Sequence, residues 1–112
     1  MKYSETPVIK VIDGRRYNTA TATEVASYEN DCFQGDCYHL SETLFMTPKG
    51  NYFIAGFGGA FSKYARRVDQ HARIGGDGLE PMTFQEAFAW AEEHCQTALT
   101  SHEPFALMVV EA

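Results

Sequence analysis

The sequence predicts an α+β domain in which a mainly antiparallel sheet of about five strands has helices packed on one face. Two hairpin patterns, each followed by a helical pattern, occupy the first two-thirds of the chain, and a long helical pattern then precedes a last apolar run. The chain has 112 residues, of which 45% are hydrophobic. This size and composition predict one domain, spanning residues 1–112, with one core.

The first predicted elements are two strands at 8–12 and 15–18 that form a hairpin. Asp-Gly at 13–14 joins them, and this pair suits the positive φ that both central positions of a tight hairpin turn require. A short helix is expected at about 21–28, because alanines and a valine there follow helical spacing after residues that can cap a helix. The segment 29–37 carries three acids and no base. It is therefore predicted to be an exposed acidic loop.

A second hairpin is predicted from strands at 38–47 and 52–55, joined by a Pro-Lys-Gly-Asn turn. Glycines within 56–59 are expected to end its outer strand. Residues 60–67 are predicted to form a second short helix, with aromatic side chains and an alanine on one side. The glycines within 71–81 favour a loop with little regular structure.

The clearest helix begins at Thr83, whose hydroxyl can form a capping box with Glu86. Its apolar residues recur at the spacing of a helix that is buried on one side. A last strand is predicted at 105–110, because this run is apolar enough to lie centrally in a sheet. The helix stripe is expected to pack on a sheet formed by 8–12, 52–55 and 105–110, and consists of Phe84, Ala87, Phe88, Ala91 and Cys95.

Composition disfavours two classes of function. The formal net charge is −6 and the pI is near 5.1, which is the wrong sign for a domain whose affinity comes from neutralising phosphates. The longest apolar run, at 105–110, is far shorter than the roughly 20 residues of a membrane span. The N-terminal residues lack the apolar stretch of a secretory signal, and three cysteines suit a reducing compartment, so a cytoplasmic location is expected.

Cysteine and histidine residues form a weak metal-site pattern. Cys32, Cys37 and His39 have C-x4-C-x-H spacing, and His94 and Cys95 could join them only if the fold brought them close. The spacing does not match a common zinc motif, so we expect no metal and no cofactor. A hydrolase or transferase that uses a cysteine nucleophile with a histidine base stays open as an alternative, although no local signature of such an enzyme is present.

Glycines at 56, 58 and 59 follow a predicted strand at a position where a backbone could bind phosphate. The residues after them do not complete a dinucleotide-binding or P-loop motif. Close passage of the backbone over neighbouring aromatic side chains explains the glycines better.

Charged residues define three candidate surfaces. The acidic loop with its aromatic residues is the candidate partner-binding site and consists of Tyr28, Glu29, Asp31, Phe33 and Asp36. A second acidic area follows the last helix at Glu80, Glu86, Glu92 and Glu93, and both areas could engage a basic groove of another protein. The alternative is a basic patch that contacts nucleic acid and consists of Lys63, Arg66, Arg67 and Arg73.

Several segments of the sequence resemble a family of small uncharacterised proteins from bacteria and their mobile elements. The resemblance covers about residues 12–94. It rests on Gly14 to Ala22, on Glu42 to Thr47 with Gly50 to Phe53, on Gly58 to Ala65, and on Pro81 to Thr83 with Glu86, Ala87 and Trp90. The family implies no established activity and no catalytic residue. It implies the genomic company of phages and mobile elements, whose small acidic proteins are often inhibitors of host defence, including anti-CRISPR proteins.

The sequence and the resemblance therefore favour a small acidic binding protein without catalysis, most concretely an anti-CRISPR inhibitor that occupies a nucleic-acid-binding surface of a host defence complex. The expected partner is a protein with a basic surface, for example a CRISPR effector complex. Direct nucleic-acid binding is disfavoured and no membrane association is expected. A small nucleic-acid-binding or regulatory domain that uses the basic patch at 63–73 is the first alternative.

Overall fold

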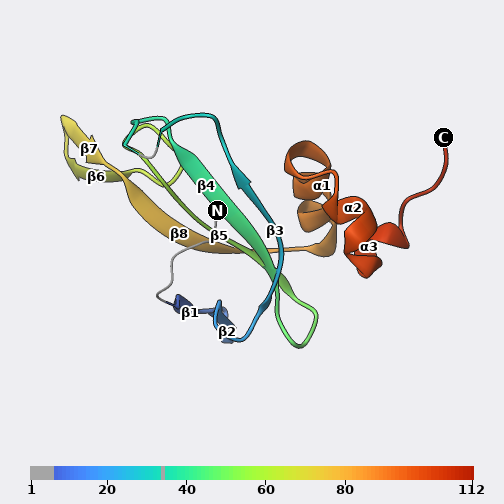
Figure 1. The fold of residues 1–112 in the computed structure, drawn as a ribbon. Helices are drawn as coiled ribbons and strands as arrows, with labels where there is room; N and C mark the ends of the chain where they lie inside the picture. Colours follow the sequence, from blue (N-terminus) through green and yellow to red (C-terminus); the bar gives the residue numbers. More distant parts are fainter. Residues whose placement is uncertain (1–6, 34) are drawn as a thin grey trace.

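The computed structural model describes residues 7–33 and 35–112 (Figure 1). The described chain holds eight strands and three short helices. Along the chain the elements are β1 (Ile9–Ile12), β2 (Arg15–Asn18), β3 (Thr23–Glu29), β4 (Leu40–Met46), β5 (Tyr52–Gly58), β6 (Arg66–Asp69), β7 (Ala72–Ile74), β8 (Gly76–Met82), α1 (Phe84–His94), α2 (Ala98–Ser101) and α3 (Glu103–Ala106). The α+β class and the antiparallel pairing are confirmed.

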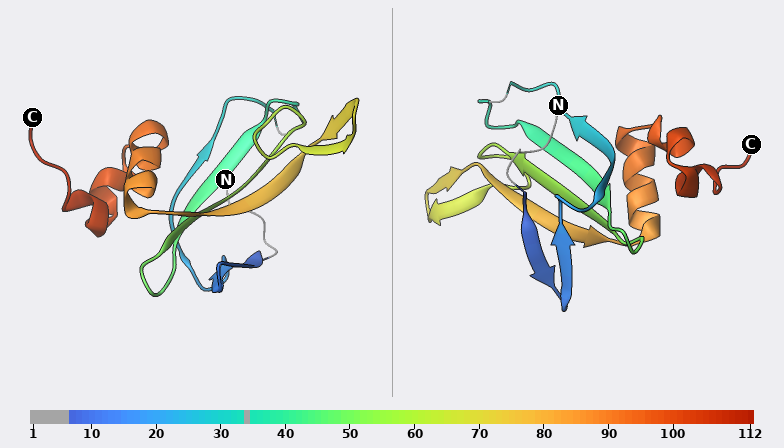
Figure 2. Two further views of the ribbon diagram at one scale, coloured as in Figure 1. Left: turned by 180° about the vertical axis from the view of Figure 1, so that it is seen from behind. Right: turned by 60° about the horizontal axis from the view of Figure 1, so that its bottom comes forward.

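The largest sheet has four strands, in the order β3-β4-β5-β8, rather than the expected five or so. Two further two-stranded sheets, β1-β2 and β6-β7, stand apart from it (Figures 1 and 2). The predicted sheet that combines 8–12, 52–55 and 105–110 is therefore wrong. Its first segment forms the separate β1-β2 hairpin, and its last segment is not a strand.

The first hairpin forms as predicted. Ile9 pairs with Asn18 and Ile12 with Arg15, and the two turn residues Asp13 and Gly14 have φ angles of 52° and 78°. These positive values are those of the turn that suits the right-handed twist of paired strands. The second hairpin, β4-β5, also forms where expected, although β5 continues through Gly58.

The helix expected at about 21–28 is wrong, because this segment forms strand β3. It pairs along its length with β4, from Thr23 opposite Met46 to Glu29 opposite Ser41, with a bulge between Glu24 and Ala26. The bulge shifts the alternation of side chains, so the apolar residues follow a spacing that resembles a helix. Pairing with a central strand outweighs the weak helical pattern.

The helix expected at 60–67 is also wrong. The segment forms turns that lead into β6, because side-chain hydrogen bonds compete with a helical ladder. The Ser62 hydroxyl donates to the Gly59 carbonyl at 2.8 Å and accepts from the Tyr64 amide at 3.2 Å. The Phe61 amide donates to the Cys37 carbonyl, which ties the turn to the preceding loop.

The loop expected at 71–81 is instead mostly β7 and β8. Strand β8 pairs with β5 from Tyr52 opposite Met82 to Gly58 opposite Gly76. It lies at the edge of the sheet, where Pro81 is tolerated because one row of amides needs no partner. Within β8, Gly78 faces the ring of Tyr64, and Gly76 lies close to the backbone carbonyl of the same residue.

The strand expected at 105–110 is wrong as well. Residues 103–106 form helix α3, whose first turn contains Pro104, a residue whose fixed φ suits a helix start. Phe105 is fully buried, whereas the apolar residues from Leu107 to Val110 are exposed. In the described part of the chain no helix is long and apolar enough to cross a membrane.

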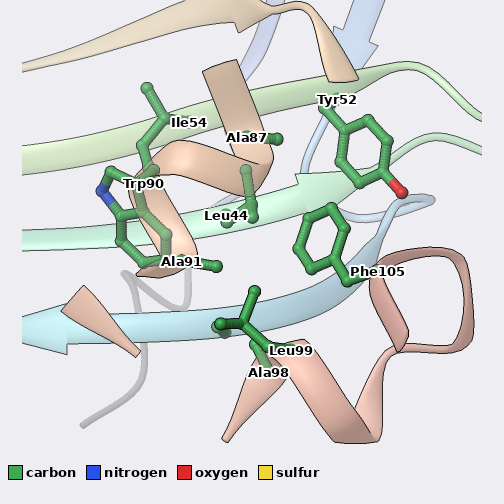
Figure 3. Packing of buried hydrophobic residues seen from close by; sticks show 10 residues of the cluster. Leu44, Tyr52, Ile54, Ala87, Trp90, Ala91, Ala98, Leu99 and Phe105 are labelled. Atoms are coloured by element: carbon green, nitrogen blue, oxygen red, sulfur yellow. The ribbon is translucent and has the colours of Figure 1, made fainter. Parts of the chain in front are cut away.

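Buried residues form two clusters that use alternate residues of β4 and β5. Leu44, Tyr52 and Ile54 share one cluster with the buried residues of all three helices (Figure 3). Tyr17 of β2 shares the other with residues that include Phe45 and Phe53. Successive strand residues point to opposite faces of a sheet, so the clusters lie on opposite sides of these strands.

Candidate binding site: an acidic cavity beside a buried carboxylate

The carboxylate of Glu42 is buried in the middle of β4, where the residue is only 2% exposed. Glu42 lies on the same side of the strand as Leu44, the side that faces the helices. Its cross-strand neighbours are Gly56 on β5 and, one strand further, Gly78 on β8. A row with one carboxylate and two glycines therefore crosses three strands.

The two glycines make room for the ring of Tyr64. A Cβ atom at Gly56 would lie 2.5 Å from the Tyr64 hydroxyl oxygen, and one at Gly78 would lie 3.1 Å from the ring. Gly56 is thus explained by close passage over an aromatic side chain, as the sequence suggested. The sequence did not identify Gly78 or Tyr64 as parts of the same arrangement.

Three donors converge on the Glu42 carboxylate. The Tyr64 hydroxyl donates to Oε2 at 2.7 Å, and the indole Nε1 of Trp90 on α1 donates to Oε1 at 3.0 Å. The Lys63 ammonium nitrogen lies 3.0 Å from Oε2, and this side chain is about half exposed. Burial of a carboxylate is costly unless such partners are present.

These partners determine the charge of Glu42. Burial acts to raise the pKa of Glu42 and is the largest single influence on it. The hydrogen bonds from Tyr64 and Trp90 and the ammonium of Lys63 together outweigh burial, so the pKa lies below its ordinary value of 4.5. The carboxylate is therefore ionised at neutral pH.

A cavity of about 480 Å³ opens beside this carboxylate; we call it the acidic cavity. Its wall includes Glu42, Lys63, Trp90 and three further glutamates, Glu80, Glu86 and Glu93. Within the described residues, Glu80 and Glu86 have no ion pair. The Glu93 carboxylate has one long contact, at 3.8 Å between Oε1 and Nε2 of the neighbouring His94. The Glu86 carboxylate also completes the capping box of α1, by accepting from the Thr83 amide at 2.8 Å.

The fold thus brings together most of the second acidic area that the sequence singled out. Glu80 comes from β8, while Glu86 and Glu93 lie two helical turns apart on α1. Glu92 is exposed and does not line the acidic cavity. With one lysine opposing four glutamates, the wall carries a net negative charge at neutral pH.

The candidate partner-binding loop begins next to the acidic cavity. Tyr28 is the cross-strand neighbour of Glu42, and its ring lies 4.2 Å from the ring of His94, which lines the cavity. The Glu29 carboxylate lies 2.7 Å from Nε2 of the buried His39. The Asp36 carboxylate accepts from the Tyr38 amide at 2.7 Å.

Two members of that loop point away from the domain. Phe33 is 85% exposed, and Asp31 is exposed without an ion pair among the described residues. Tyr28, Glu29 and Asp36 have structural contacts, so Asp31 and Phe33 are the members most available to a partner.

The basic patch is divided by the fold. Lys63 is held by Glu42, whereas Arg66, Arg67 and Arg73 lie on the β6-β7 ribbon, which we call the β6-β7 arm. This arm projects from the sheet at the end away from the helices (Figures 1 and 2). Arg67 and Arg73 are directly opposite each other in its register.

The cysteines and histidines do not assemble into one site. No group of three or more metal-ligating side chains converges within the described part of the chain. His94 contacts Tyr28 and Trp90, while His39 contacts Glu29. Cys37 and His39 line one cavity of about 450 Å³, but the described contacts include no hydrogen bond between them. Cys32, Cys37 and Cys95 are free thiols.

Sequence reasoning did not identify Glu42, Tyr64 or Trp90 as a site. The sequence did carry one indication of this site, because Glu42 is a single acid inside a strand-forming run and a buried charge there needs partners. Nothing in the sequence pattern showed which residues those partners are.

Comparisons of this chain with protein-family models, with curated proteins and with solved structures find no match.

Proposed function

We propose that this chain is a binding protein without catalysis that occupies a basic surface of a nucleic-acid-handling complex, most concretely as a phage or mobile-element inhibitor of a CRISPR effector complex. The observation that supports the proposal is the acidic cavity, which Glu80 and Glu86 line together with Glu42; among the described residues neither Glu80 nor Glu86 has an ion pair. In this proposal the protein acts inside the cell, where such complexes are found.

An arginine or lysine of the partner is the group that this cavity suits. Its volume of about 480 Å³ is large enough for one or two such side chains. A cation that enters the cavity gains from several carboxylates at once, and Trp90 supplies an aromatic wall. Charge complementarity of this kind raises the association rate and selects basic partners over acidic ones.

The acidic loop extends the same binding surface. Tyr28 contacts His94 at the cavity, and the chain from Tyr28 leads directly to the exposed residues Asp31 and Phe33. An exposed aromatic residue beside carboxylates is the combination in which the ring fills a pocket and the charges steer the approach. The acidic cavity and the acidic loop thus act on one partner in this proposal.

The test measures binding of guide-RNA effector complexes of several types to their DNA targets as this protein is added. The double variant Glu80→Gln/Glu93→Gln removes one carboxylate from a strand and one from a helix of the acidic cavity. It is expected to require about tenfold more protein for the same inhibition. The matched control is Glu24→Gln/Glu92→Gln, which makes the same charge change at an exposed strand residue and an exposed helix residue outside the cavity, and should stay within about twofold.

The outcomes separate the parts of the proposal. Unchanged target binding with the unaltered protein, across all effector types, would remove the anti-CRISPR version. Equal losses in the two double variants would assign the effect to net charge and remove the acidic cavity as the site.

The loop is tested by Phe33→Ala, with Phe61→Ala as the control at another exposed phenylalanine. Phe33→Ala should raise the dissociation rate of the complex, because anchors act mainly on dissociation. Neutralising Asp31 and Asp36 together should chiefly lower the association rate and its salt dependence. Unchanged affinity in these variants and in Tyr28→Ala would remove the loop as the site.

A nucleic-acid-binding function is the second candidate, supported by the β6-β7 arm. All four residues of β6 are exposed, and the arginines of the arm have no ion pair among the described residues. A two-stranded ribbon of this kind fits the major groove of DNA. If the protein binds heparin or single-stranded DNA at moderate salt, Arg66→Gln/Arg67→Gln should abolish this binding, whereas Lys10→Gln, at an exposed residue of β1 outside the arm, should not.

A further inference from the structure

A second cavity, with the opposite charge, lies between the turn of the β1-β2 hairpin and the turn that joins β4 to β5. It has a volume of about 550 Å³, and we call it the cationic cavity. Its charged wall residues are Arg15, Arg16 and Lys49, and no carboxylate lines it among the described residues. Asp13 and Glu86 line an adjoining cavity instead, and Arg15 lines both cavities.

Three cations gathered around one cavity are unexpected in a chain with a formal net charge of −6. Arg15, Arg16 and Lys49 are all exposed, and none has an ion pair in the described part of the molecule. An anionic ligand in this cavity would gain attraction from the cationic residues that line it. The acidic residues of this chain are mostly elsewhere, including the acidic cavity.

Both walls of the cationic cavity are well defined by the fold. Tyr17 fixes β2 to the central sheet, because it is 5% exposed and its ring meets Phe53 edge to face at 5.4 Å between centroids. In the opposite turn, the Thr47 amide donates to the Asn51 carbonyl at 2.7 Å and the Gly50 amide donates to the Thr47 carbonyl at 2.9 Å. Binding groups carried on such closed turns lose less freedom when a ligand binds.

The donors of this cavity suit phosphate groups. Guanidinium groups form paired hydrogen bonds with the oxygens of phosphates, and an ammonium adds a point charge. Asn51 and Thr47 in the wall carry neutral polar side chains that can bind further oxygens. The ring of Tyr17 is buried against Phe53, so the wall of the cavity offers little aromatic surface on which a nucleic-acid base could stack.

We infer that the cationic cavity binds a ligand that carries neighbouring phosphate groups. This site is separate from the acidic cavity, so the inference does not depend on the proposed function. The phosphates could belong to a small oligophosphate or to a nucleic-acid backbone, and the experiment has one arm for each source.

The first arm titrates the protein with inorganic tripolyphosphate at low ionic strength by calorimetry. Arg15→Gln/Arg16→Gln should weaken binding by about tenfold or more, since charge-assisted hydrogen bonds are the strong ones. Lys49→Gln should weaken it from the other wall, in an exposed turn where the fold does not depend on the side chain. The matched control for the lysine variant is Lys10→Gln, at an exposed residue of β1 that does not line the cationic cavity, and its binding should stay within about twofold.

The second arm adds a single-stranded oligonucleotide to the tripolyphosphate complex. Displacement of tripolyphosphate, together with loss of oligonucleotide binding in Arg15→Gln/Arg16→Gln, would assign the site to a nucleic-acid backbone. Tripolyphosphate binding that the oligonucleotide does not displace would assign it to a small oligophosphate. No binding of either probe by the unaltered protein, or equal weakening of tripolyphosphate binding by Lys49→Gln and Lys10→Gln, would overturn the inference.

Discussion

Glu42 shows how a single residue can be costly and stabilising at once. Burial alone would favour its neutral form, but three donors from two segments hold it as a carboxylate. The contribution of Glu42 to the free energy of unfolding therefore depends on its carboxylate being ionised. It also connects β4 to α1 and to the turn before β6, which are distant in the sequence.

We expect Glu42→Gln to lower the free energy of unfolding by about 2 kcal/mol at pH 7, the range for hydrogen bonds to a charged group. The folded pKa of Glu42 lies below 4.5, so its contribution is complete above that pH and is lost as the pH falls through the folded pKa. Urea unfolding of the unaltered protein and of Glu42→Gln at several pH values measures this contribution. The difference between them should shrink below pH 4.5, and a difference that stays constant down to pH 2 would contradict the assignment.

Gly56 tests the space that Tyr64 occupies. Gly56→Ala places a Cβ atom 2.5 Å from the Tyr64 hydroxyl oxygen and should cost about 1 to 3 kcal/mol, the usual range for overpacking. Gly35→Ala is the control, because a Cβ atom there meets nothing within 4 Å. Thermal unfolding compares the two, and equal melting temperatures would show that the ring moves away without cost.

At the scale of elements, the sequence predicted those that local signals define. The Asp-Gly turn of the first hairpin and the capping box at Thr83 both form, because their determinants lie within a few residues of each other. Strand β3 and strand β8 were missed, because partner strands decide their conformation. The glycines of β8 indicated a loop, whereas in the fold Gly78 makes room for Tyr64.

The predicted terminal strand shows the same limit. The apolar run at 105–110 has the composition of a central strand, yet only Phe105 enters the core, from a helical turn that follows Pro104. Phe105 stacks on Tyr52, with ring centroids 5.6 Å apart. The nearby His102 imidazole lies 2.8 Å from the Tyr52 hydroxyl, and burial lowers the pKa of His102, so this contact uses the neutral imidazole.

Phe105→Ala should therefore release α2 and α3 from the sheet and cost about 3 to 5 kcal/mol, the usual loss for an emptied aromatic site. Phe88→Ala should cost less, since Phe88 is only half-buried although it belongs to the predicted helix stripe. Denaturant unfolding of the two variants measures the order. A larger loss in Phe88→Ala would show that α1, rather than α3, carries the main aromatic anchor.

At the scale of the whole molecule, acidic and basic side chains gather mainly in different places among the described residues. The acidic cavity lies between α1 and the central sheet, while the cationic cavity lies at the β1-β2 hairpin and the β6-β7 arm projects elsewhere. The sequence indicated an acidic protein with one basic patch. It could not show that Glu80, Glu86 and Glu93 share a cavity or that Lys63 is separated from the arginines, because both facts depend on the packing of α1 and Tyr64.

We expect folding of the whole molecule to be independent of metal ions, because the cysteine and histidine spacings define no closed set of four ligands. The melting temperature should be the same with and without a chelator, and metal analysis should find no stoichiometric zinc. Zinc that is lost together with the fold would show that Cys32, Cys37 and His39 form a site after all.

Trp90 is the only tryptophan of the chain, and its indole both donates to Glu42 and lines the acidic cavity. Fluorescence that is excited selectively in the absorption band of tryptophan therefore comes from one known position. A ligand that enters the cavity changes the polarity around that indole, and protonation of Glu42 removes the charged acceptor of its N–H group. Emission recorded on the unlabelled protein thus reports both occupancy of the cavity and the charge at its wall.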